Sequence, residues 1–204
     1  MASDLSRRRV LGLGLAAGAA ICLVPGLPRA VWALDVGQAR GLIDKAVADV
    51  NSIIASGKSE SAMFADFERV FINYADVPVI ARSALGVAAR SASPAQMTAF
   101  TKAYQGYISR KYGRRFREFI GGRIEVTDAK PMKSWYEVIS VAHLQGEAPF
   151  DLRWHVSDKS GSLRFFNLII EGVNMLASER AEIGAMLDKA KGDVDALTAT
   201  LKNA

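Results

Sequence analysis

Cysteine and histidine are scarce in this sequence. The single cysteine is Cys22, and the only histidines are His143 and His155. One thiol cannot form an intrachain disulfide, so a disulfide-stabilised fold and a cysteine-ligated metal centre are excluded. Two histidines alone make a zinc site of the ordinary His/Cys type nearly impossible. The motif G-x-S-x-G of serine hydrolases is also missing. We therefore expect neither a bound metal nor a cofactor.

The first 33 residues have the pattern of an export signal. The stretch SRRRVL at residues 6–11 is typical of a twin-arginine leader, and an uncharged run follows up to Pro28. Residues 31–33 (VWA) fit a processing site, and Pro25 and Pro28 disfavour a stable membrane span. We interpret residues 1–33 as a cleaved signal and expect the rest to work in the bacterial periplasm. An uncleaved N-terminal anchor is the alternative.

Residues 34–204 have the size of one domain with a sizeable core. The leader holds four of the 26 Lys and Arg residues and one of the 21 Asp and Glu residues, which leaves a net charge of about +2. Much of the high isoelectric point therefore comes from the leader, and nucleic acid is not an expected partner for an exported protein.

Apolar residues recur at helical spacing through the first part of the chain and again at its end. Ser93 and Gln96 are placed as a capping box around Pro94, and Gly86 and Gly121-Gly122 are suited to end helices. The helices predicted from these signals are 36–56, 61–73, 78–85, 94 to about 119, about 173–191, and 193–201.

The period changes to two between these helical regions. Residues 123–129, 134–144, 149–157 and 163–171 carry β-branched and aromatic side chains in alternation. Helices first, an antiparallel meander of about four strands next and a closing helix predict an α+β domain. The helices are expected on one face of a curved sheet.

Candidate catalytic groups are few. The alternation places His155 with Asp151 on a strand face that we expect to be solvated, and no nucleophile motif accompanies this pair. Structural or surface roles are expected for both histidines, and a role in satisfying backbone groups for Glu171. A small periplasmic hydrolase that uses His155 and Asp151 is an alternative, but the sequence favours a protein without enzymatic activity.

The densest basic cluster lies at Arg110, Lys111, Arg114, Arg115 and Arg117. On a helix these residues form adjacent stripes. They either form a solvated face or contact lipid phosphates or an acidic partner.

Several blocks resemble the MlaC family of periplasmic phospholipid-binding proteins, also called toluene-tolerance auxiliary proteins. In chain order these blocks are YADVPVIARSALG (74–86), ASPAQ (92–96) with Phe100, the stretch from Tyr107 to Tyr112, IIEGV (169–173), and Arg180. Departures occur at Asn167, where the family usually has aspartate, at Asn174, where it has serine, near Leu163, and at residues 88–90. These departures leave the identity of the lipid open.

The resemblance implies a domain in which sheet and helices enclose an apolar pocket for acyl chains, with the head group near the mouth. Arg82 and Arg180 would tie helices to strand ends rather than bind phosphate. The candidate pocket residues are Phe71, Tyr74, Val77, Ile80, Leu85, Phe100, Tyr104, Ile108, Val138, Leu152, Trp154, Phe166, Leu168 and Ile170.

The resemblance further implies a monomeric lipid carrier. It would shuttle phospholipid between an inner-membrane ABC-transporter complex, with its lipid-binding subunit, and an outer-membrane lipoprotein complex. A carrier for another apolar ligand, such as a hopanoid, and an adaptor with a solid core are the remaining alternatives.

Overall fold

The computed structural model describes residues 35–113 and 118–204. The proposed leader and its processing site therefore lie outside the described residues. The helices are α1 (Val36–Ile54), α2 (Glu60–Tyr74), α3 (Val77–Leu85), the 3₁₀ helix η1 (Gly86–Arg90), α4 (Pro94–Gly113), α5 (Met175–Lys189) and α6 (Val194–Asn203). The strands are β1 (Arg123–Pro131), β2 (Tyr136–His143), β3 (Phe150–Ser157), β4 (Arg164–Ile170) and β5 (Val173–Asn174).

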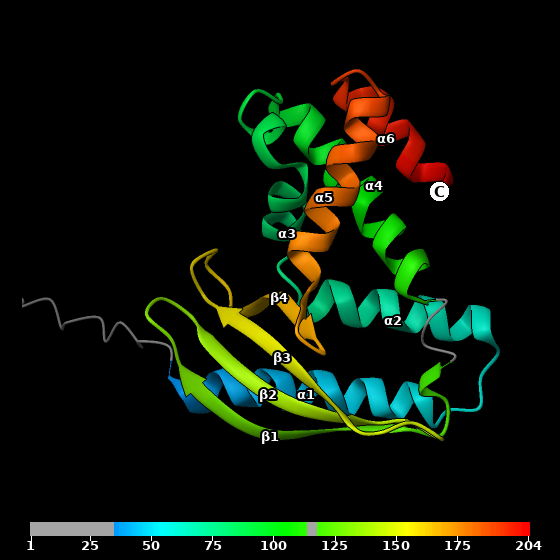
Figure 1. The fold of residues 1–204 in the computed structure, drawn as a ribbon, viewed down its shortest axis with the longest axis vertical. Helices are drawn as coiled ribbons and strands as arrows, with labels where there is room; N and C mark the ends of the chain where they lie inside the picture. The colour runs from blue at the N-terminus through cyan, green and yellow to red at the C-terminus, as the bar shows by residue number, and fades with distance from the viewer. Residues whose placement is uncertain (1–34, 114–117) are drawn as a thin grey trace, which may run out of the picture. The chain divides into compact units, whose positions relative to one another are not determined.

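The strands form one antiparallel sheet in the order β1-β2-β3-β4-β5. Helix α1 packs across β1 and β2, while α3 and α5 pack together and contact β4 (Figure 1). The expected α+β class, with helices on an antiparallel sheet and a helix that closes the chain, is confirmed.

Local capping fixes the helix ends. Ser93 and Gln96 form the expected capping box, with Gln96 N donating to Ser93 Oγ at 3.2 Å and Ser93 N donating to Gln96 Oε1 at 3.0 Å. Gly86 follows α3 with φ of 66° and ψ of −130°, a conformation that only glycine adopts readily. Asn51 of α1 exchanges two hydrogen bonds of 2.9 Å with the backbone of Ile124, which ties this helix to β1.

The sheet continues one strand further than the sequence pattern predicts. Glu171 and Gly172 both have positive φ (50° and 79°), as in a two-residue hairpin turn, and Val173 pairs with Ile170. The last long helix therefore begins at Met175 rather than at Val173. Asn174 caps it, with Ala177 N donating to Asn174 Oδ1 at 3.1 Å.

The long middle helix was expected to reach about Phe119. Its described part ends at Gly113, residues 114–117 lie outside the described part of the chain, and a 3₁₀ turn includes Glu118 and Phe119.

Alternate side chains of the sheet face the core. Val138 and Ser140 of β2 pair with Trp154 and Leu152 of β3, which pair in turn with Leu168 and Ile170 of β4. Val138 and Ser140 are completely buried, whereas Leu168 and Ile170 are only half-buried. The inward face of the sheet is therefore fully covered by core packing at β2, whereas the same face is only partly covered at β4.

Candidate functional site: an apolar cavity with a buried polar network

A partly open cavity of about 390 Å³ lies in the domain, lined by residues of β1, β3, β4, α1, α2, α3, α4 and α5. Its size falls within the range of sites that hold one small molecule. Most of its lining is apolar. The lining residues are Ala46, Val50, Phe67, Val70, Phe71, Ile80, Tyr104, Ile108, Ser109, Tyr112, Gly113, Glu118, Phe119, Ile124, Leu144, Glu147, Phe150, Leu152, Trp154, Phe165, Phe166, Asn167, Leu168, Ile170, Glu171, Met175, Leu176 and Glu179.

Nine of the fourteen sequence-predicted pocket residues line this cavity: Phe71, Ile80, Tyr104, Ile108, Leu152, Trp154, Phe166, Leu168 and Ile170. They come from helices and strands far apart in the sequence, and the alternation of β3 and β4 brings four of them to one wall. Contact of these side chains with lipid stays a prediction.

The other five predicted residues, Tyr74, Val77, Leu85, Phe100 and Val138, do not line the cavity. Phe100 is fully buried and stacks on Tyr104, with 5.8 Å between ring centroids. The Tyr74 hydroxyl donates to Asp49 Oδ2 at 2.7 Å. Val77, Leu85 and Val138 belong to the packed core. An inward-facing apolar pattern is shared by solid core and cavity wall, so it did not separate the two.

Aromatic rings support the cavity wall. Phe165 packs edge-on against Trp154 at 5.2 Å between centroids and at a tilt against Phe71 at 6.4 Å. The Trp154 indole N–H donates to Ser140 Oγ at 2.9 Å, so its polar atom is satisfied in the buried layer behind the wall. Because these side chains are held by their neighbours, they cannot simply collapse into the space.

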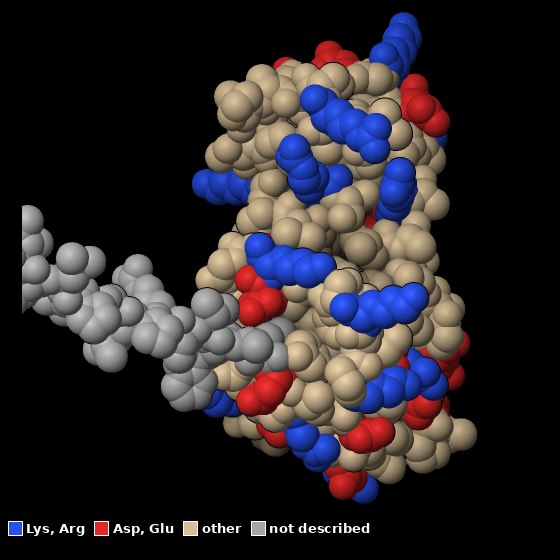
Figure 2. Space-filling view, turned by 90° about the vertical axis from the view of Figure 1, so that its left-hand side faces the viewer, with Lys and Arg blue, Asp and Glu red and all other residues tan. Residues whose placement is uncertain are grey.

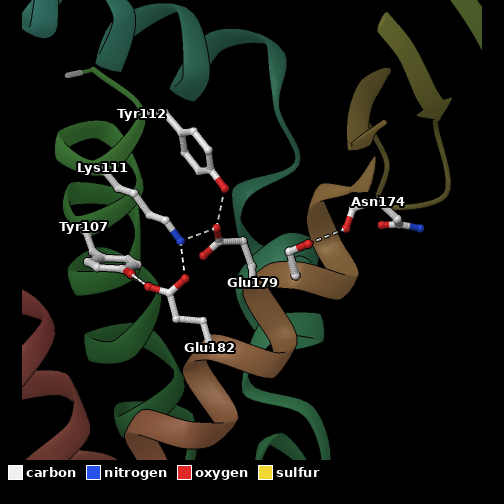
Figure 3. A network of polar contacts seen from close by, with 7 residues as sticks. Tyr107, Lys111, Tyr112, Asn174, Glu179 and Glu182 are labelled. Carbon is white, nitrogen blue, oxygen red and sulfur yellow. Dashed lines mark hydrogen bonds and ion pairs between the residues drawn. The ribbon is translucent and has the colours of Figure 1, made fainter. Parts of the chain in front are cut away.

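A polar network joins α4 and α5 beside the cavity (Figure 3). Lys111 Nζ donates to Glu179 Oε1 at 2.8 Å and also to Glu182 Oε2. The hydroxyl of Tyr107 donates to Glu182, and that of Tyr112 donates to Glu179. Two carboxylates therefore share one ammonium group and two phenols across the helix interface.

The network shifts the pKa values of Lys111, Tyr107, Tyr112 and Glu182. Burial alone would lower the pKa of Lys111, but hydrogen bonds to Glu179 and Glu182 outweigh it and raise the pKa to about 12. Burial and the hydrogen bond to Glu182 raise the pKa of Tyr107 to about 12, and burial raises the pKa of Tyr112 strongly. Burial opposes ionisation of Glu182, yet hydrogen bonds from Lys111 and Tyr107 lower its pKa. At neutral pH the lysine is charged and the tyrosines are neutral.

Sequence reasoning missed this network because its partners are distant in sequence. Lys111 was assigned to an exposed basic stripe with Arg110, whose guanidinium instead donates to the backbone carbonyls of Leu201 and Ala204. The i,i+3 and i,i+4 spacings of Glu179 with Glu182, and of Tyr107 with Lys111, are the only local signal of a shared helix face.

Two of the five residues of the expected basic stripe, Arg110 and Lys111, lie in the described part of the chain. Arg110 and Lys111 are engaged within the domain, and Arg114, Arg115 and Arg117 lie outside the described residues. On the face shown in Figure 2, Lys and Arg side chains are spread over its height rather than gathered in one patch.

The expectation of a solvated His155 is wrong. His155 is buried against the Trp135 ring, 3.9 Å away between centroids, and its Nε2 lies 3.5 Å from Glu137 Oε2. Burial lowers the pKa of His155 although Glu137 favours its charged form. Asp151 lies four residues away along the same strand, about 13 Å, so the two do not form a catalytic pair. Glu137, which the sequence analysis did not consider, is the carboxylate that His155 faces.

Two further expected residues occupy other settings. Glu171, expected to satisfy backbone groups, is exposed in the hairpin turn. Arg180 of α5 lies over Gly86, with its Nε 3.4 Å from the position of a Cβ at that glycine, so it contacts the end of α3 rather than a strand end. Arg82 is exposed.

Two features are absent from the described residues. No helix within residues 35–113 and 118–204 has the length and apolar character needed to cross a bilayer. The same part of the chain holds no cluster of three His, Cys, Asp or Glu side chains that is arranged to ligate a metal ion.

The fold and the sequence are both similar to those of known proteins. A phospholipid-binding protein from Ralstonia solanacearum, solved in complex with a phospholipid at 1.53 Å, has a similar fold with a TM-score of 0.69. The two sequences are 18% identical, and the match covers 81% of this chain and 95% of that one, so this likeness establishes the fold. The family model described as MlaC protein matches residues 44–203. The chain therefore belongs to the MlaC family.

Proposed function

We propose that this protein is a lipid carrier that binds phospholipid acyl chains in the cavity between its sheet and helices. The observation that carries the proposal is the 390 Å³ apolar cavity within a chain of the MlaC family. The phospholipid bound to the Ralstonia solanacearum protein of the same fold supports it. Binding is favoured over catalysis, because His155 and Asp151, the candidate catalytic pair, are too far apart to act together.

The physical reason for such a cavity is the cost of moving lipid through water. Each buried methylene contributes roughly 0.8 kcal/mol, so a lipid with on the order of 28 methylenes would need roughly 20 kcal/mol to cross water unprotected. An apolar cavity offsets this cost for the methylenes that enter it. Bilayer and protein then become similar environments for the chains, and lipid can pass between them without ATP being consumed within the carrier.

We further propose that the protein works in the periplasm, exported by its twin-arginine leader. There it would accept and deliver lipid between an inner-membrane ABC-transporter complex and an outer-membrane lipoprotein complex. The leader sequence at residues 6–11 and the family membership support this role.

Lipid extraction from the purified protein, followed by mass spectrometry, tests the binding proposal. We expect a stoichiometric phospholipid and uptake of labelled phospholipid from vesicles of phosphatidylethanolamine and phosphatidylglycerol. A protein that is free of lipid and takes none up would refute the proposal. A co-purified hopanoid would instead show a carrier for a different apolar ligand.

A further inference from the structure

Two polar atoms of the cavity wall have no hydrogen-bond partner among the described residues. They are Glu179 Oε2 and the Tyr104 hydroxyl. Glu179 is 3% exposed, Tyr104 is 0% exposed, and both line the cavity. Buried polar atoms are nearly always paired, so two unpaired ones at the wall of a cavity point to a partner that enters the cavity.

The rest of the polar network does not supply this partner. Lys111 and Tyr112 both donate to the other oxygen of Glu179, Oε1. Figure 3 shows the second carboxylate oxygen turned away from the Tyr112 hydroxyl. Oε1 is therefore held firmly while Oε2 remains free to accept.

Tyr104 lies on the same face of α4 as Tyr107 and Lys111, and its ring centroid is 6.4 Å from that of Tyr107, so it stands beside the network. Burial is the main reason why its pKa is strongly raised, and the negative charge of Glu179 is the next. Its hydroxyl consequently stays protonated and can donate. The cavity wall thus offers one strong acceptor and one donor.

We propose that Glu179 and Tyr104 form a recognition point for a hydroxyl group of the bound lipid. This inference rests on the proposed lipid-binding function and adds a ligand class to it. A hydroxyl both donates and accepts, so it satisfies Glu179 and Tyr104 together. A primary ammonium lacks an acceptor for the tyrosine, a methyl ether lacks a donor for the carboxylate, and a carboxylate or phosphate is repelled by Glu179.

Four probes with the same chain and different end groups test this assignment: decanol, decyl methyl ether, decylammonium and decanoate. Their affinities for the delipidated protein are measured by calorimetry or by displacement of a fluorescent fatty probe. We expect decanol to bind about tenfold more tightly than the ether, since the ether leaves the carboxylate oxygen unpaired. Decanoate should bind most weakly.

Substitutions then locate the recognition point. Glu179→Gln presents an amide that can still accept from Lys111 and Tyr112 while it turns its NH₂ group toward the cavity, so the alcohol-to-ether ratio should fall to within about twofold. Glu182→Gln is the matched control. It removes a charge from the same Lys111 cluster at a residue that does not line the cavity, and it should leave the tenfold ratio intact.

Tyr104→Phe is the second test variant, because it removes only the hydroxyl, which makes no hydrogen bond within the described residues. It should lower the affinities for decanol and for the ether by a similar several-fold factor, because both oxygens can accept from the tyrosine, and leave that for decylammonium unchanged. Equal affinities of alcohol and ether in the wild type would overturn the assignment, since an ordered water would then satisfy Glu179. Tighter binding of decylammonium than of decanol would overturn it too.

Uptake of labelled phospholipid, measured on the same samples, distinguishes a failure of the hydroxyl site from a failure of the carrier function. Uptake together with equal affinities for alcohol and ether refutes only the hydroxyl site. No uptake and no binding of any probe refutes the carrier function as well.

Discussion

The indole of Trp154 donates to the hydroxyl of Ser140 across neighbouring strands, at 2.9 Å, in a fully buried position. Trp154 lines the cavity, whereas Ser140 lies behind it in the core. One short polar contact therefore fixes the largest ring of the wall at the point where the packed part of the sheet meets the open part.

Ser140→Ala should destabilise the protein by about 1–3 kcal/mol, because it leaves the buried indole N–H without a partner. Urea denaturation measures the effect. Ser157→Ala, on the neighbouring strand, is the control, since its hydroxyl accepts only a long 3.3 Å bond from Lys159 N at the surface. In a Trp154→Phe background the cost of Ser140→Ala should shrink, and an unchanged cost there would show that the contact is not its source.

Ile170 and Ile169 are neighbours on β4, both half-buried, and only Ile170 lines the cavity. Ile170→Lys should reduce phospholipid uptake at least tenfold, because it brings a charge into the apolar space. Ile169→Lys, on the opposite face, should leave uptake within about twofold of wild type. Both are measured as transfer of labelled phospholipid from vesicles, after circular dichroism has shown that each variant is folded. Equal losses in the two variants would contradict the assigned cavity wall.

Alkaline pH should weaken the domain through the α4–α5 network. Lys111 and Tyr107 keep their protons up to a pKa of about 12 in the folded protein, above the ordinary values of about 10.4 and 10. Their stabilisation is thus fully present below about pH 10 and is lost as the pH rises through the folded values. For Glu182, whose pKa is lowered, stabilisation is present above about pH 4.3 and is lost on acidification.

Urea midpoints between pH 8 and 11 measure this loss. Lys111→Met should flatten the alkaline decline, whereas Lys102→Met, at an exposed position of the same helix, should leave it unchanged. A decline of the same steepness in both variants would place its origin elsewhere in the protein.

Gly86 and Gly41 should respond in opposite ways to alanine. Gly86 has a φ of 66° and lies against Arg180, so Gly86→Ala should cost about 1–3 kcal/mol. Gly41 lies within α1 with open space where a Cβ would stand, so Gly41→Ala should stabilise the protein by about 0.5–1 kcal/mol. Thermal unfolding of the two variants compares them directly. A stabilising Gly86→Ala would contradict the backbone conformation at the end of α3.

The proposed export by a twin-arginine leader gives a prediction that depends on the sequence alone. Replacement of both Arg7 and Arg8 by lysine should prevent export, because the twin-arginine pair is the feature that identifies this route. Arg29→Lys is the control within the same leader. Cell fractionation with an antibody against the folded domain gives the readout, and periplasmic protein from the double variant would rule out twin-arginine export.

Local chemistry made most elements predictable. The capping box of Ser93 and Gln96, the stop at Gly86 and the alternation of β3 depend on residues a few positions apart. Strand β5 was missed because it depends on the left-handed conformation of Glu171, which is unusual for a residue other than glycine. A two-residue strand also leaves no periodic pattern to detect.

The candidate site was only partly predictable for a different reason. Leu152 and Val138 have the same alternation and both face inward, yet only Leu152 meets empty space. What distinguishes them is how far the helices stand from each strand, which depends on the whole packing. Lys111 likewise looked like a surface residue, because its partner Glu179 lies 68 positions later.

The cavity wall runs from Ala46 in α1 to Glu179 in α5, which has a consequence for synthesis. A nascent chain whose C-terminal helices are still within the ribosome has an incomplete wall and exposes Phe71, Leu168 and their neighbours to water. Such intermediates aggregate readily, so the wall can be completed safely only after α5 has left the ribosome.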